Sequence, residues 1–452
     1  MNARLPLLSA AGLALATLFF LSVAFVRRAP DPSFGGRYAS EWARDLLSAD
    51  YKTRSDAQGA LQRLGEAGVP QLRVMVRKEN LPWDGLLQRL NRVVPGFNYR
   101  TCDAILARQR AAEMLGLLGV QGRSAVPELI ALLANDQTDA EAERALVRIG
   151  ADSIPALELA LHSRNTDARR RSVSLLGEMG NLSKTSRTAL LATARDPAAV
   201  VRKQAAATLC RATTASEAVL PALLLLSADS APEVRAAAFA SLGSLGQRTE
   251  PVVFALRRGL SDSKSVVQLQ AAKALWRIER NGALAVPVLT RILGTSVGWE
   301  AAYALGEIGT YASNAIPALV KVLREERVPR AFRTPPSSAY ALGQIGESAV
   351  PALLRVLTDN EPAARLSAVL ALGFMGKKAQ PAVPKLLALL RDRDTDVRHA
   401  AALTLPGIGA NSEEIIEALS DCLQADDIYM RFTAAEALRE IAPDRHWVVN
   451  PE

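Results

Sequence analysis

The chain has 452 residues, a formal net charge of +8, and 49% hydrophobic but only 5% aromatic residues. This length exceeds what one hydrophobic core usually serves, so we expect several domains or one extended repeat array. The three cysteines lie far apart, which excludes a disulfide framework and a paired-cysteine metal site. Residues 51–110 carry most of the excess charge, which argues against a nucleic-acid track along the whole chain.

Residues 5–26 form an apolar stretch without a charge, long enough to cross a membrane as a helix. A cleaved signal peptide is the alternative, although its apolar region is normally about 7–15 residues long. The sequence therefore predicts a signal-anchor or transmembrane helix at 1–28 and a Pro/Gly-rich tether at 29–37. We expect a single-pass protein of a bacterial inner membrane with its main domain on the periplasmic side. Release after cleavage and a cytoplasm-facing domain are the alternatives.

From residue 38 to 443 the sequence repeats. Several repeats contain an aspartate, then four residues, then Val-Arg, and a leucine seven residues after the arginine. Examples are 196–209, 229–242 and 392–405. The leucine recurs, with ten of eleven gaps between 30 and 37 residues, at Leu61, Leu115, Leu146, Leu176, Leu209, Leu242, Leu275, Leu305, Leu342, Leu372, Leu405 and Leu438. Such a period predicts stacked helical units, none of which buries its apolar face alone.

A second motif precedes each of these Arg-bearing helices, for example AVPALLRVL at 349–357. Proline is tolerated in the first turn of a helix, so each unit reads as a Pro-initiated helix, a turn at Asp, and an Arg-bearing helix. Glycines near the end of the second helix are expected to form the sharp turn into the next unit. They are Gly177, Gly243, Gly306, Gly343 and Gly373.

These motifs resemble the HEAT repeat, and specifically the bacterial phycobilisome-lyase HEAT-like repeat, over residues 38–443. The resemblance implies an all-α, right-handed superhelix of about twelve helical hairpins, followed by a tail at 444–452. It implies Pro helices outside and Arg helices lining a concave face. It also implies a structural ladder with the turn aspartates, broken at Gln268 and built from Arg54, Arg108, Arg169, Arg202, Arg235, Arg365, Arg398 and Arg431.

Two insertions interrupt the array, at 78–103 and 324–336. Aromatic and basic residues mix in the first, which predicts a loop that contacts anionic lipid or a partner; an ordinary capping loop is the alternative. Its candidate residues are Trp83, Arg89, Arg92, Phe97, Tyr99 and Arg100. The second insertion could act as a lid over the concave face.

Counting from the Arg as place zero, we expect places three, four, seven and ten to be buried. Places five and nine then face the concave side. This face turns apolar in the later repeats, and exposed apolar patches usually mark binding sites. The candidate partner-binding residues are Trp299, Tyr303, Tyr340, Leu370, Phe374 and Leu403. Coverage by a loop of this chain and a different helix phase are the alternatives.

Three histidines, at 162, 399 and 446, show no metal-binding spacing, and His399 reads as a surface residue without a partner. Enzymes resembling deoxyhypusine hydroxylase use His-Glu pairs, and this sequence has none. We therefore expect no catalytic residues, cofactor, metal or nucleic acid, and a scaffold that binds unidentified proteins. A phycobilin-lyase-like or hydroxylase-like HEAT enzyme and an anionic-lipid binder are the alternatives.

Overall fold

The computed structural model describes residues 31–77, 104–180, 182–212, 218–326, 336–409 and 413–447. These residues are mostly helical, and two short strands, β1 (Ser33–Phe34) and β2 (Arg37–Tyr38), pair antiparallel at the beginning. The chain divides into two compact units, Met1–Thr213 and Thr214–Glu452, called unit 1 and unit 2 below. Among the described residues, no helix has both the length and the apolar character needed to cross a bilayer.

Several predicted segments lie outside the described residues. They are the N-terminal segment 1–28, the insertion at 78–103 and residues 327–335 of the second insertion. The six candidate loop residues between Trp83 and Arg100 fall in the first insertion, so their role stays a prediction.

Unit 1 consists of helical hairpins joined by short 3-10 turns. Its α-helices are α2 (Ala39–Asp45), α3 (Tyr51–Leu64), α4 (Val69–Val76), α6 (Ala104–Leu118), α7 (Val126–Leu132), α8 (Asp139–Ile149), α9 (Ile154–Ala160), α10 (Thr166–Met179), α11 (Lys184–Ala192) and α12 (Ala199–Ala212). The 3-10 turns are η1 (Gly65–Gly68), η2 (Gly119–Ala125), η3 (Gly150–Ser153) and η4 (Thr193–Arg195).

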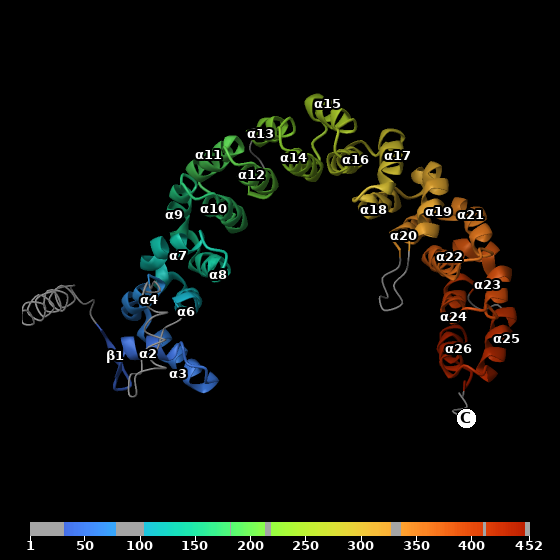
Figure 1. Cartoon of the computed structure of the whole chain (residues 1–452), viewed down its shortest axis with the longest axis horizontal. Helices are drawn as coiled ribbons and strands as arrows, with labels where there is room; N and C mark the ends of the chain where they lie inside the picture. Colours follow the sequence, from blue (N-terminus) through green and yellow to red (C-terminus); the bar gives the residue numbers. More distant parts are fainter. Residues whose placement is uncertain are drawn as a thin grey trace, which may run out of the picture. The chain divides into compact units, whose positions relative to one another are not determined.

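Unit 2 continues the same hairpins in two layers (Figure 1). The second helix of each hairpin, which corresponds to the Arg-bearing helix of the repeat, belongs to what we call the inner layer: α14 (Pro232–Leu245), α16 (Ser265–Glu279), α18 (Gly298–Ile308), α20 (Ser337–Ile345), α22 (Pro362–Met375), α24 (Thr395–Gly409) and α26 (Ile428–Ile441). The outer layer holds α13 (Val219–Leu226), α15 (Glu250–Gly259), α17 (Gly282–Arg291), α19 (Ile316–Glu325), α21 (Val350–Val356), α23 (Val383–Leu389) and α25 (Glu413–Asp421). Short 3-10 turns connect them: η5 (Ile292–Gly294), η6 (Gly309–Ala315), η7 (Glu347–Ala349), η8 (Gly376–Ala382) and η9 (Cys422–Gln424).

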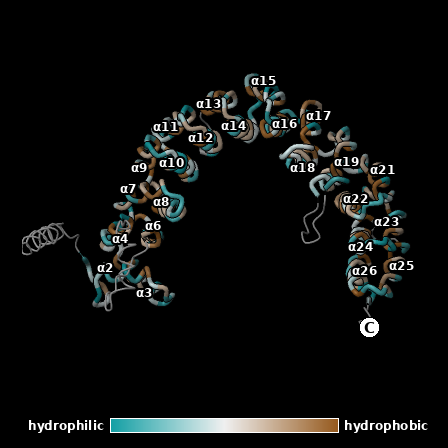
Figure 2. Tube along the Cα trace, in the orientation of Figure 1, coloured by the Kyte–Doolittle hydropathy of each residue, from teal (hydrophilic) through white to brown (hydrophobic). Residues whose placement is uncertain are grey.

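The core of each unit lies between the layers. Hydrophobic positions alternate with hydrophilic ones along every hairpin (Figure 2). The recurring leucine is buried throughout, from Leu61 to Leu438, and is at most 1% exposed. Truncating such a side chain to alanine typically costs about 2–5 kcal/mol. The leucine period therefore marks the residues on which stacking of the hairpins depends.

The glycine prediction was wrong about which glycine makes the turn. Gly243 and its four equivalents lie inside helices, whereas the turn uses a glycine three residues later. The turn glycines have φ between 58° and 83°, a region that side chains disfavour: Gly180, Gly246, Gly309, Gly346 and Gly376. The helical glycines instead allow close packing of neighbouring helices, because a Cβ on Gly243 would lie 2.7 Å from the Cβ of Ala274.

The arginine ladder joins consecutive hairpins. Arg235 Nη1 donates to the carbonyls of its own turn, Asp229 and Ser230, at 2.9 and 3.0 Å. Its Nε and Nη2 donate to both carboxylate oxygens of Asp262 in the next turn, at 2.8 and 2.9 Å. The same bidentate pairing, with a spacing of 27 residues, joins Arg169 to Asp196 and Arg365 to Asp392. Each guanidinium thus fixes the distance between two turns.

The Arg–Asp bridges of the ladder are missing where α16, α18 and α20 stack. Gln268 keeps one of the arginine's bonds, donating to the Asp262 carbonyl at 2.5 Å, but its amide carries no charge. The residue 27 places later is Thr295 rather than an aspartate. Gly298 and Pro335 take the arginine place in the next two units. The predicted break at Gln268 is therefore part of a longer gap in the ladder.

A reversed bridge occurs in unit 1. In α8, Asp139 occupies the position that the ladder arginine has in other repeats, seven residues before the recurring leucine. The positive charge comes instead from Arg171 of the following hairpin. Arg171 donates to the Leu133 carbonyl at 2.7 Å and to Asp136 at 2.8 Å, and its side chain is 6% exposed. Neighbouring hairpins are thus still joined by an Arg–Asp ion pair, but here the earlier hairpin provides the aspartate and the later one the arginine.

The bridges predict how stability depends on pH. Burial alone would raise the pKa of Asp392, but hydrogen bonds from Arg365 and the Asp394 amide, with nearby positive charge, outweigh it and lower the pKa. The bridge therefore contributes fully above the unfolded-state pKa of about 4, and its contribution is lost as pH falls through the lower folded-state pKa.

Asp392→Asn should lower the free energy of unfolding at pH 7 by about 1–3 kcal/mol, since the amide accepts without a charge. It should also make the loss of stability below about pH 4 shallower. Urea titrations followed by circular dichroism at pH 7 and pH 3 measure both effects. The matched control is Glu347→Gln, an exposed change in the same unit. Equal behaviour of the two variants would contradict the assigned role of the bridge.

Candidate binding face of the inner helices

The six candidate partner-binding residues lie on the open surface of the inner layer of unit 2. Places three and four are buried, as Ala301 and Ala302 show in α18. The candidates at other places are exposed or half-buried: Trp299 is 59% exposed, Tyr303 43%, Phe374 40% and Leu403 52%, whereas Tyr340 and Leu370 are half-buried. The structure thus brings these side chains together on four successive helices, α18 to α24.

Four of them form a continuous series of ring contacts, which we call the aromatic strip: Trp299, Tyr303, Tyr340 and Phe374. Trp299 and Tyr303 meet edge to face, with centroids 6.4 Å apart. The rings of Tyr303 and Tyr340 lie 4.7 Å apart at 32°, and those of Tyr340 and Phe374 lie 5.9 Å apart at 80°. These distances are within the favourable range for aromatic pairs. The strip therefore crosses two seams, α18 to α20 and α20 to α22.

Two helical glycines make room for two of the four rings. A Cβ on Gly306 would lie 2.9 and 3.1 Å from ring atoms of Tyr340, and one on Gly343 would collide with Phe374. Each ring therefore fills a notch left by the preceding helix. Rings fixed in this way lose little conformational freedom when a partner binds.

The aromatic strip lies where the arginine ladder lapses. No Arg–Asp bridge of the ladder type is formed by the described residues of α16, α18 and α20. Aromatic contacts cross these seams instead, including a pair between Trp276 of α16 and Tyr311 of η6 at 5.8 Å. The rings thus stabilise the stack and also present an apolar surface.

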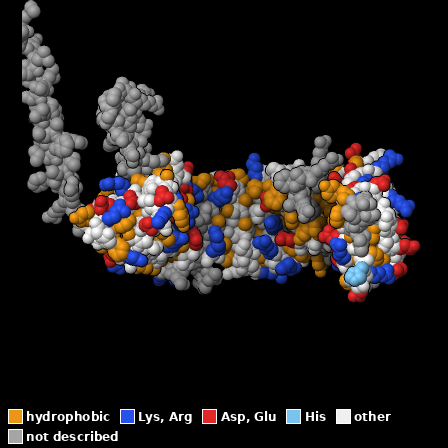
Figure 3. All heavy atoms as spheres, turned by 90° about the horizontal axis from the view of Figure 1, so that it is seen from below, with side chains coloured by type: hydrophobic (Ala, Val, Ile, Leu, Met, Phe, Trp, Pro, Cys, Tyr) orange, Lys and Arg blue, Asp and Glu red, His pale blue; other side chains and the backbone are white. Residues whose placement is uncertain are grey.

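Charged side chains flank the strip on the inner layer. Arg277 on α16 and Glu436 and Glu440 on α26 are exposed, and Lys273 is half-buried. Figure 3 shows hydrophobic side chains beside Lys and Arg over this part of the chain. The face can therefore offer both apolar contact and charge selection to a partner.

Sequence reasoning missed Phe432 on α26. It is 54% exposed and occupies the first place after the arginine, the same place as Trp299 on α18. Only places five and nine had been assigned to this face, and extending the assignment to place one would have found Phe432.

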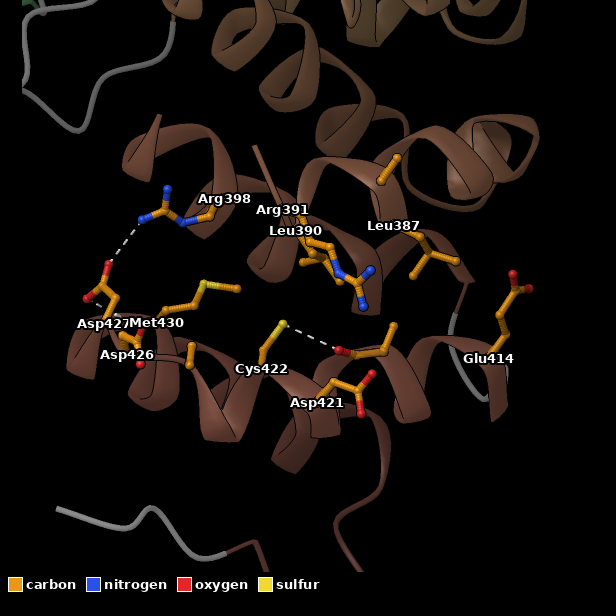
Figure 4. Close-up of a pocket in the computed structure, with 13 residues that line it drawn as sticks. Leu387, Leu390, Arg391, Arg398, Glu414, Asp421, Cys422, Asp426, Asp427 and Met430 are labelled. Carbon is orange, nitrogen blue, oxygen red and sulfur yellow. Dashed lines mark hydrogen bonds and ion pairs between the residues drawn. The ribbon is translucent and has the colours of Figure 1, made fainter. Parts of the chain in front are cut away.

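A cleft of about 680 Å³ opens between the last two hairpins (Figure 4). The Arg398–Asp427 spacing is 29 residues instead of 27, and Arg398 Nη2 lies 3.5 Å from the carboxylate. His399 Nε2 lies 3.5 Å from the Asp427 carboxylate, but it has no hydrogen-bond partner among the described residues. Burial and the nearby Asp421 raise the pKa of the Cys422 thiol that lines the cleft, which makes it a poor nucleophile at neutral pH.

Two family profiles of helical repeats match the sequence, in agreement with this architecture. The HEAT-repeats profile matches residues 154–243, 187–276, 337–406 and 383–446, which together make up more than half of the chain. The chain belongs to the HEAT-repeat family. The profile of the PBS lyase HEAT-like repeat matches residues 297–325 of this HEAT protein. No curated protein sequence matched this chain.

Solved structures with a similar fold include importins. An importin β structure aligns with a TM-score of 0.54 and 15% identity, covering 90% of this chain and 55% of the importin. Yeast importin β (Kap95p) aligns with a TM-score of 0.53 and 14% identity over 89% and 55%. The HEAT protein thus spans about half the length of these importins, and the likeness shows the fold alone.

The CpcE–CpcF complex of phycocyanin lyase from a Nostoc species is 27% identical over 33% of this chain and 98% of the matched chain. Its TM-score is 0.30, so we draw no argument from it.

The glycine notches predict opposite effects for two helical glycines. Gly343→Ala should destabilise the protein by about 1–3 kcal/mol, because the new methyl group forces Phe374 out of its notch. Gly407→Ala should be neutral or stabilise by up to about 1 kcal/mol, since nothing lies within 4 Å of its added Cβ. Thermal unfolding of both variants checks this. A neutral Gly343→Ala would contradict the tight seam.

Proposed function

We propose that this HEAT protein is a non-catalytic scaffold that binds a partner protein through the inner layer of unit 2. The observation that carries the proposal is the aromatic strip, in which glycine notches hold Tyr340 and Phe374 and the side chains of Trp299, Tyr303 and Phe374 are 40–59% exposed. Rigid aromatic side chains are the usual anchors of protein interfaces. Leu370 and Leu403 extend the apolar surface beside them.

The structural neighbours support a partner of this kind. A Kap95p structure aligns with 13% identity and a TM-score of 0.53. It describes how binding of Kap95p changes the conformation of the switch loops of RanGDP. Kap121p, with 14% identity and a TM-score of 0.51, was solved bound to Ste12p. Both neighbours therefore bind other proteins. We extend only the mode of action, protein binding by a HEAT solenoid, to this chain.

The proposal also includes a membrane tether. The apolar residues 5–26 support an anchor helix at 1–28, and the basic and aromatic insertion at 78–103 supports contact with anionic lipid near the membrane. We place the repeats on the periplasmic side of a bacterial inner membrane. The tether would hold the scaffold and its partner close to the bilayer.

Photo-crosslinking from the inner layer tests the binding face. A crosslinking amino acid at Leu370 in the full-length protein, in native membranes, should capture a partner. The Tyr303→Ala/Phe374→Ala variant should reduce the capture at least about tenfold, which corresponds to the loss of one anchor. The matched control is Phe254→Ala, which removes a ring that is 68% exposed on the outer layer.

Circular dichroism of each variant must show that the fold is kept, because these rings also cross the seams between helices. A folded Tyr303→Ala/Phe374→Ala variant that retains every crosslinked partner would refute the binding face. Loss of capture in the Phe254→Ala control as well would do the same.

A further inference from the structure

Two pairs of like charges lie at opposite ends of the aromatic strip. Lys273 and Arg277 lie on α16, and Glu436 and Glu440 lie on α26. None of the four forms an ion pair with another described residue, unlike the ladder arginines of the same layer. Exposed charges without intramolecular partners are available to select a ligand by charge.

Between the two charged ends, places five and nine carry a single charged side chain, the exposed Glu307 at place nine of α18. On α20, α22 and α24 these places hold Tyr340, Gln344, Leu370, Phe374, Leu403 and Gly407. The exposed pair Lys377 and Lys378 lies outside the inner helices, in η8. The face is therefore basic at α16, carries one carboxylate on α18, is uncharged at these places on α20, α22 and α24, and is acidic at α26.

We infer that this face binds an extended polypeptide segment of the partner, laid across the inner helices. The segment is acidic at the end over α16, apolar in the middle and basic at the end over α26. The inference rests on the proposed function and specifies the chemistry of its partner. Charge complementarity at the ends gives the segment one orientation, and the strip provides the anchoring contacts.

The length of the segment follows from helix packing. Packed helices lie about 8–10 Å apart, so the five seams from α16 to α26 span about 40–50 Å. An extended chain advances about 3.3 Å per residue, which corresponds to a segment of about 12–15 residues.

Two synthetic fluorescent peptides test the charge pattern. Both have 14 residues and the same middle of alternating leucine, proline and serine. Peptide EK has two glutamates at one end and two lysines at the other, and peptide EE has two glutamates at both ends. Binding is measured by fluorescence anisotropy to the full-length protein in nanodiscs of uncharged lipid, at low salt.

The wild-type protein should bind peptide EK about fivefold more tightly than peptide EE, as expected for two exposed ion pairs. Glu436→Lys/Glu440→Lys should reverse the order, so that peptide EE binds more tightly. These exposed substitutions leave the core untouched. An unchanged preference in this variant, or failure of both peptides to bind, would overturn the inference.

The Tyr303→Ala/Phe374→Ala variant separates the inference from the proposed function. Weaker binding of both peptides to this variant, with the EK preference kept, supports the two together. If the ring variant weakens both peptides but the charge variant leaves their order unchanged, the charge pattern is refuted and the binding face stands. If the ring variant has no effect on peptides or on crosslinking, the binding face itself is refuted.

Discussion

The stacking of this protein depends on the bridge between an arginine of one turn and an aspartate of the next. A guanidinium is planar and offers five donors, so it can bind two carbonyls of its own turn and both oxygens of the next carboxylate at once. Arg365 does so with its side chain only 11% exposed. Because the carboxylate also accepts the Asp394 amide, the bridge sets the conformation of the next turn as well as its distance.

Where this bridge is missing, the protein uses aromatic rings and glycine notches instead. The change from ionic to aromatic contacts begins at Gln268 and ends at Arg365, where bidentate pairing resumes. Ionic bridges are satisfied within the chain and leave little to offer a ligand. Rings that cross a seam at the surface keep one face open, so the same residues can stabilise the stack and bind a partner. A local departure from the repeat rule is where function is expected.

The sequence predicted the features that repeat. The leucine period and the Pro-initiated helices follow from the residues themselves, whereas the inner position of the Arg-bearing helices was implied by the resemblance to HEAT repeats. The turn glycines were misassigned because helices end by backbone conformation, and Gly243 and Gly246 look equally suitable in sequence. The Arg171 bridge was missed because its cation comes from the following hairpin. The ring contacts of Tyr340 could not be predicted from the sequence, because they depend on the space that Gly306 leaves in another repeat.

Native-state hydrogen exchange tests most directly whether the bridges hold the stack together. Repeat arrays open in parts according to the strength of each seam. The amides of α18 and α20 should exchange with a lower opening free energy than those of α14 and α22, and Gln268→Arg/Thr295→Asp, which restores a bridge, should raise protection of α18. A single opening free energy for all inner helices, unchanged in the double variant, would contradict the account.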